Sequence, residues 1–129
     1  MCACEDFTSD DSELFEFEGL ALSTNPDKKI DTELSDIIDV IEECKMINSS
    51  DTKLKFWKMF VVDALIGNTD RHNGNWGFLV NKKTKKVTFA PIYDCGSCLN
   101  PMIEDKEIES LNDTELKNLA INCYSCLKE

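Results

Sequence analysis

The chain has 129 residues, of which 42% are hydrophobic and 30% are charged, with two Trp and seven Phe. This length supports a single domain, and this composition is typical of a globular chain and excludes disorder throughout. The formal net charge of -11 repels nucleic-acid phosphates and anionic lipid headgroups, so direct binding to nucleic acid or to membranes is not expected.

The chain carries no sign of export or membrane insertion. No apolar stretch approaches the roughly 20 residues that a membrane-spanning helix requires, and Met1 is followed by small and acidic residues instead of a basic segment and an apolar core. Seven cysteines, an odd number, fit reduced thiols better than a disulfide framework. We therefore expect a cytoplasmic protein.

The first part of the chain contains one clear helix. Residues 1–11 are small and acidic with a single aromatic, Phe7, and indicate a short strand that runs into a loop. Residues 12–23 mix apolar and acidic side chains in a pattern that favours neither a helix nor an irregular segment. After the turn at Pro26, apolar residues recur at three- and four-residue spacing and predict an amphipathic helix over 32–44.

A second helix is predicted from Ser50, capped by Ser or Asp, with its main part over Lys53–Ile66. Its apolar residues, including Trp57, occupy almost the whole circumference, a pattern typical of a helix buried in the core. Gly67 is expected to end it, because glycine readily adopts the left-handed conformation that terminates many helices.

The rest of the chain predicts a hairpin and a last helix. Two short apolar runs, 76–80 and 87–93, are joined by a lysine-rich segment and read as a hairpin with a solvated turn, Trp76 lying in the core. Residues 113–127 repeat a helical pattern. The predicted fold is therefore α+β and mainly helical, with one short β-hairpin packed on the long helix.

The loop between the long helix and the hairpin carries the residues that indicate chemistry. Asp70 and Asn75 have the D-x-x-x-x-N spacing of a kinase catalytic loop, in which the Asp faces the acceptor hydroxyl and the Asn binds metal. The hairpin then leads to Asp94, which opens a D-x-G motif of the kind that supplies a metal-binding aspartate. Arg71 and His72, in the same loop, are the only arginine and the only histidine of the chain.

These motifs, 65–75 and 90–94, resemble the two catalytic motifs of HipA-like kinases, and the Asp-Arg-His core also resembles phosphatidylinositol kinases. The resemblance implies transfer of a phosphoryl group from ATP, with Mg²⁺, to a protein Ser or Thr hydroxyl. It assigns the following roles: Asp70 catalytic; Asn75 and Asp94 metal ligands; His72 a loop organiser near the phosphates; Glu5 and Phe7 an adenine-side hinge.

The resemblance also sets the expected domain organisation. Residues 1–129 would form one kinase C-terminal lobe, with 1–11 as the hinge segment and 56–99 as the catalytic and metal-binding core. Nothing ahead of Glu5 could supply the glycine-rich loop and phosphate-binding lysine of an upper lobe. We therefore expect weak activity in isolation, a protein substrate, and an upper lobe that is missing or comes from a partner chain.

Two alternatives rest on the cysteines. Two C-x-x-C pairs, Cys95 with Cys98 and Cys123 with Cys126, could form a four-thiolate zinc site in a non-catalytic binding module, although the gap between the pairs exceeds that of usual zinc ribbons. The first pair could also be a thioredoxin-like redox motif, but too little chain follows it to complete that fold. A purely structural role for Asp94 and His72, in capping and loop hydrogen bonds, is the third alternative.

Overall fold

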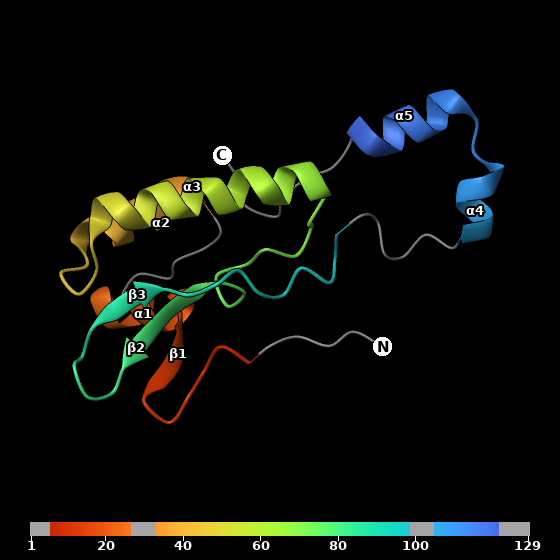
Figure 1. The fold of residues 1–129 in the computed structure, drawn as a ribbon. Helices are drawn as coiled ribbons and strands as arrows, with labels where there is room; N and C mark the ends of the chain where they lie inside the picture. The colour runs from red at the N-terminus through yellow and green to blue at the C-terminus, as the bar shows by residue number, and fades with distance from the viewer. Residues whose placement is uncertain (1–5, 27–32, 99–104, 122–129) are drawn as a thin grey trace.

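The computed structural model of the chain describes residues 6–26, 33–98 and 105–121, in which five helices accompany a three-stranded antiparallel sheet (Figure 1). The elements in chain order are β1 (Ser12–Glu16), α1 (Phe17–Thr24), α2 (Leu34–Glu43), α3 (Ser49–Ile66), β2 (Gly77–Asn81), β3 (Val87–Phe89), α4 (Asp105–Ser110) and α5 (Asp113–Ile121). The fold is therefore α+β and mainly helical, as the sequence predicts.

The sheet extends the predicted hairpin by one strand. β2 pairs with β3, which confirms the hairpin, although β3 ends at Phe89 and the residues up to Tyr93 are irregular. On its other side β2 pairs with β1, in a register that places Phe15 opposite Phe78. Residues 12–23, which showed no clear local pattern, thus form β1 and most of α1. Their strand is specified by a partner far along the chain, which local periodicity does not reveal.

Trp76 lies at the centre of an aromatic cluster that joins the helices to the sheet. Its ring stacks on Phe17 of α1 with centroids 4.2 Å apart and on Phe89 of β3 at 5.7 Å, and it is tilted against Phe56 of α3 at 5.2 Å. Trp76 is 1% exposed, which confirms its prediction as a core residue. Because Trp76 directly follows the loop 68–75, this cluster anchors the end of that loop in the core.

The ends of α3 are set by two local devices. Asn48 caps its start, because the side-chain oxygen accepts a hydrogen bond from the Asp51 N–H at 3.0 Å. The prediction of a Ser or Asp cap is therefore wrong. At the other end Gly67 adopts the left-handed conformation with φ 64°, and its N–H donates to the Asp63 carbonyl, as expected for a helix-terminating glycine.

Only one face of α3 is buried in the described part of the chain. Phe56 and Met59 on that face are fully buried against the core, beside α2. The opposite face exposes apolar side chains, namely Leu54 (56%), Trp57 (42%), Val61 (53%), Val62 (43%) and Leu65 (75%). The prediction of a helix buried around its whole circumference, Trp57 included, is therefore wrong for these residues, because the sheet and α2 lie on one side of it only.

The helix predicted over 32–44 is present as α2, from Leu34 to Glu43. α4 was not predicted, whereas α5 confirms the helix that starts at Asp113; the predicted end of that helix, at Leu127, lies outside the described residues. Both helices lie apart from the sheet and α3 in Figure 1, and their described side chains are exposed. No helix of the described residues is long and apolar enough to cross a membrane.

Gly77 offers a direct test of the β1–β2 contact. A Cβ atom at this position would lie 2.8 Å from Glu16 Cα and closer still to the Phe15 carbonyl oxygen, and backbone atoms cannot rotate away. We expect Gly77→Ala to lower the free energy of unfolding by about 1–3 kcal/mol or more, measured by urea denaturation. Gly96→Ala is the matched control, because nothing lies within 4 Å of a Cβ there. Equal unfolding midpoints for the two variants would contradict this packing.

Candidate active site

The loop 68–75 is held closed by hydrogen bonds to its own backbone. Asn75 Nδ2 donates to the Asp70 carbonyl oxygen at 2.8 Å, and the His72 N–H donates to the same oxygen at 3.1 Å. Asn75 is 7% exposed, whereas Asp70 is exposed. The two residues of the D-x-x-x-x-N motif are therefore brought together, one at the rim of the loop and one beneath it.

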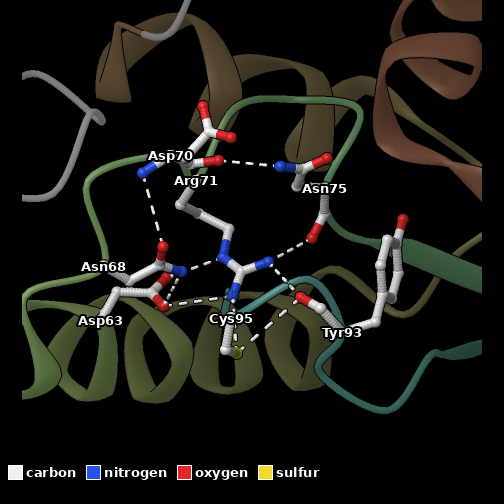
Figure 2. A network of polar contacts seen from close by, with 7 residues as sticks. All are labelled: Asp63, Asn68, Asp70, Arg71, Asn75, Tyr93 and Cys95. Carbon is white, nitrogen blue, oxygen red and sulfur yellow. Dashed lines mark hydrogen bonds and ion pairs between the residues drawn. The ribbon is translucent and has the colours of Figure 1, made fainter. Parts of the chain in front are cut away.

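Figure 2 shows the Asp70 carboxylate pointing away from the polar network that supports the loop. No hydrogen bond or ion pair to another residue of the described segments occupies this carboxylate. Its backbone, by contrast, is bound on both sides, since the N–H also donates to Asn68 Oδ1 at 3.4 Å. The loop thus presents a carboxylate that is positioned by its main chain and open to a reactant.

Arg71 is the centre of that network. Its side chain is fully buried and forms a two-pronged ion pair with Asp63 of α3, with Nε–Oδ2 at 2.8 Å and Nη2–Oδ1 at 3.1 Å. Asn68 Nδ2 donates to Asp63 Oδ1 at 2.8 Å, so both carboxylate oxygens are engaged. A buried charge is tolerated only when it is paired and hydrogen-bonded, and this pair meets that condition.

Burial, the largest single influence, lowers the pKa of the Arg71 guanidinium. The hydrogen bonds and charge of Asp63, and more weakly those of Cys95, together outweigh it, and the net pKa lies above its ordinary value. Arg71 is therefore a permanent cation in the interior.

The same guanidinium also reaches the second motif. Arg71 Nη1 donates to the carbonyl oxygen of Asn75 and to that of Tyr93, the latter at 2.6 Å, and Nη2 donates to Cys95 Sγ at 3.4 Å (Figure 2). One side chain therefore binds the backbone of both motifs. This contact brings the loop that carries Asp70 and the segment that carries Asp94 into one site.

Asp94 adopts an unusual backbone conformation between two residues that Arg71 contacts. Its φ is 53°, in the left-handed region that few residues other than glycine occupy, although Asp is among the more tolerant. The neighbours Tyr93 and Cys95 are both bonded to the Arg71 guanidinium. Backbone strain of this kind persists where surrounding contacts enforce it. The Asp94 side chain is exposed to solvent.

Tyr93 lies against both the loop and the first described residues. Its hydroxyl donates to the Gly74 carbonyl oxygen at 3.2 Å, and its ring centroid lies 5.9 Å from that of Phe7. Burial, followed by the charge of Glu16, raises the pKa of Tyr93 to about 12, with Arg71 acting in the opposite direction. The predicted hinge residue Phe7 is therefore next to the segment that carries Asp94, whereas Glu5 lies outside the described residues.

His72 has a local role in the loop. Its ring nitrogen Nδ1 accepts a hydrogen bond from the Gly74 N–H at 3.1 Å, and the side chain is exposed. This contact is the loop-organising part of the predicted role. Its contact with phosphates stays a prediction.

The donor atoms fit a magnesium ion that arrives with a nucleotide. Asn75 offers Oδ1, because its amide nitrogen is already bonded to Asp70, and Asp94 offers a free-standing exposed carboxylate. Mg²⁺ is commonly held by one or two protein oxygens together with phosphates and water. Among the described residues, no group of three or more His, Cys, Asp or Glu that could hold a metal ion occurs.

The zinc alternative is only partly visible. Cys95 and Cys98 are free, half-buried thiols in one turn, and the other predicted ligands, Cys123 and Cys126, lie outside the described residues. The four-thiolate site therefore stays a hypothesis. It does not explain why the Arg71 guanidinium contacts Cys95 Sγ.

The comparison with known proteins defines the class. Residues 16–123 match the model of the HipA-like C-terminal domain family, and the chain belongs to this family. Over 107 residues it is 46% identical to the serine/threonine-protein kinase CtkA of Helicobacter pylori, an alignment that spans 81% of this chain and 33% of CtkA. The crystal structure of CtkA matches it with a TM-score of 0.88 and 41% identity, over 97% of this chain and 47% of that one.

The chain thus spans about a third of the length of the curated relative that it matches. The family match also begins forty residues ahead of Phe56, where the motif-based resemblance began, and so includes α1 and α2. It confirms the resemblance to HipA-like kinases and the kinase-like fold.

Two residues of the site were not assigned a role from the sequence. Arg71 stands out in the sequence as the single arginine, and Asp63 falls within the predicted apolar helix Lys53–Ile66. A signal was present, since Asp63 is the one acid between Thr52 and Gly67 and lies eight residues before the one arginine. An acid inside an apolar helical run is a candidate for a buried ion pair.

We expect Arg71→Met to lower the free energy of unfolding by about 3–5 kcal/mol, because it leaves the buried Asp63 carboxylate without its partner. The double variant with Asp63→Leu should recover part of this loss, since no charge then remains unpaired. Lys83→Met, which breaks the exposed Lys83–Asp11 pair, is the control and should cost less than about 1 kcal/mol. An unchanged urea midpoint for Arg71→Met would contradict the assigned role.

The raised pKa of Tyr93 predicts that the free energy of unfolding depends on pH in the alkaline range. Its folded-state pKa of about 12 lies above the ordinary 10.0, so its contribution to stability is fully present below pH 10 and is lost as the pH rises through about 12. Phenolate absorbance should show one tyrosine ionising near pH 12, and Tyr93→Phe should remove that signal. A wild-type titration with both tyrosines at ordinary pKa values would refute this.

Proposed function

We propose that this chain carries the phosphoryl-transfer centre of a serine/threonine protein kinase that uses ATP and Mg²⁺. The observation that carries the proposal is the Arg71 guanidinium, which bonds the backbone of Asn75 in the first motif and of Tyr93 in the second. A loop with a purely structural role would not need a link to the segment of Asp94, an exposed aspartate 24 residues after Asp70. The kinase relative CtkA supports the acceptor class.

Asp70 is the catalytic residue in this proposal. Its exposed carboxylate accepts the hydrogen bond of the acceptor hydroxyl, orients the oxygen towards the transferred phosphoryl group, and takes the proton as the new bond forms. The hydrogen bonds that Asn75 Nδ2 and the His72 N–H donate to the Asp70 carbonyl oxygen hold Asp70 in place without occupying its carboxylate. A general base requires this geometry, because its backbone must be fixed while its carboxylate stays accessible to the acceptor hydroxyl.

Asn75 Oδ1 and the Asp94 carboxylate would hold the magnesium ion. When bound, Mg²⁺ neutralises the negative charge that develops on the transferred phosphoryl group. His72 accepts a hydrogen bond at Nδ1, so Nε2 is the ring atom left to donate to a phosphate oxygen. Phe7, in contact with Tyr93, would lie on the adenine side, with Glu5 beside it in the chain.

We further propose that the glycine-rich loop and the phosphate-binding lysine of an upper lobe are supplied from outside residues 1–129, by a partner chain or by further sequence. The substrate is then a protein, and transfer by these residues alone should be weak, since the loss of phosphate-clamping groups removes several kcal/mol of transition-state stabilisation. A cytoplasmic location and the absence of direct nucleic-acid contact stay predictions.

The proposal is tested by calorimetric titration with Mg²⁺ and a non-hydrolysable ATP analogue. We expect saturable binding that requires Mg²⁺ and that weakens in Asp94→Ala by more than the roughly 10- to 100-fold loss typical for a residue that only supports a metal ligand. Asp70→Ala should leave this binding intact but lower phosphoryl transfer by roughly 10²- to 10⁴-fold, because it removes the general base alone.

Glu109→Ala, which removes an exposed acid of α4, is the control for the change in net charge and should bind like the wild type. Nucleotide binding that persists in Asp94→Ala would exclude the assigned role of Asp94. Stoichiometric zinc without any nucleotide response would favour the cysteine-based binding module instead.

A further inference from the structure

Cys95 and Cys98 form a pair of thiols that the proposed phosphoryl transfer does not use. They lie in one turn, directly after Asp94, in which the Cys98 N–H donates to the Cys95 carbonyl oxygen at 3.3 Å. Both thiols are free and half-buried. Cys44, the other cysteine among the described residues, is 5% exposed in the core and far less accessible to reagents.

The turn keeps the backbones of Cys95 and Cys98 close enough for a disulfide. A hydrogen bond from an N–H to the carbonyl oxygen three residues earlier is typical of a β-turn, in which the first and last Cα atoms lie within about 7 Å. Disulfides join Cα atoms roughly 4.4–6.8 Å apart. Gly96, next in the turn, has open space around it, so the backbone can adjust without a clash.

Cys95 also contacts the centre of the site. Arg71 Nη2 donates to Cys95 Sγ at 3.4 Å, and the Cys95 thiol lies 3.9 Å from the Tyr93 carbonyl oxygen, to which Arg71 is also bonded. Asp94, with its left-handed backbone, is held between these two contacts. A change in the direction of Cys95 Sγ therefore acts on Arg71 and on the residue beside it.

We propose that Cys95 and Cys98 are a reversible disulfide site, and that the bond turns Cys95 Sγ away from Arg71 and displaces Asp94. A small disulfide such as oxidised glutathione is the oxidant. The Cys95–Cys98 bond forms, the S–S bond of the reagent breaks, and two electrons and two protons pass to the reagent, which leaves as two thiols. The effect on nucleotide binding rests on the proposed function, whereas the bond and its effect on Arg71 do not.

The experiment treats the chain with oxidised glutathione and then with dithiothreitol, and follows two signals. Peptide mass mapping locates the disulfide. The Nε–Hε resonance of Arg71 can be assigned at once, because the chain has no other arginine. We expect a Cys95–Cys98 linkage together with a shift of this resonance, both reversed by dithiothreitol.

Matched variants assign the response. Cys98→Ser should leave the resonance of the reduced protein and its basal nucleotide binding in place but abolish the response to oxidant. The double variant Cys123→Ser, Cys126→Ser removes the other C-x-x-C pair and should respond like the wild type. A mixed disulfide with glutathione at Cys95 alone, or a linkage that requires Cys123 or Cys126, would overturn the proposal.

Nucleotide titration of the oxidised and reduced wild type separates this proposal from the preceding one. A reversible loss of Mg²⁺-dependent binding of at least roughly tenfold on oxidation supports both. If neither the oxidised nor the reduced protein binds nucleotide, the proposed function is refuted. The mapped linkage and the shift of the Arg71 resonance then still test whether the disulfide forms and acts on Arg71. Formation of the linkage without any shift of the Arg71 resonance would overturn the coupling to the site.

Discussion

The buried ion pair between Asp63 and Arg71 is the interaction on which the rest of the site depends. Both side chains are excluded from solvent, at 1% and 0% exposed, and the desolvation of two such charges is offset only by close and complete hydrogen bonding. That requirement fixes the guanidinium to the end of α3. The remaining donors then reach the carbonyl oxygens of Asn75 and Tyr93, so the pair's main effect is on geometry, more than on net stability.

The aspartates of the site divide into two kinds by environment. Asp63 is buried and paired and sets the position of the other residues, whereas Asp70 and Asp94 are exposed and project from backbone that the network holds. Asp70 and Asp94 must be accessible because a reactant has to reach their carboxylates. Asp63 must be buried and fully bonded because it fixes the position of the other residues. The aromatic cluster around Trp76 adds rigidity where the loop enters β2. The left-handed backbone of Asp94 is tolerated because of this support.

Much of the candidate site could be predicted from the sequence, because its motifs are short. The D-x-x-x-x-N spacing singled out Asp70 and Asn75, which a hydrogen bond joins within one short loop, while their chemical roles stay predictions. β1 could not be predicted, because its partner in β2 lies far along the chain and no local periodicity reports it. The exposed face of α3 was predicted as buried, because an apolar helix looks the same whether neighbours cover one side or both.

By itself, the sequence determined what neighbouring residues can specify: the helices α2 and α3, the glycine that ends α3, the hairpin, and the order of the two motifs. The reason is that helical hydrogen bonds and turns connect residues only a few positions apart. Only the tertiary structure decided that Arg71 would link the motifs and that Asp63 would be its partner. Those contacts join residues that chain spacing leaves independent, and burial turns a single arginine into the centre of the site.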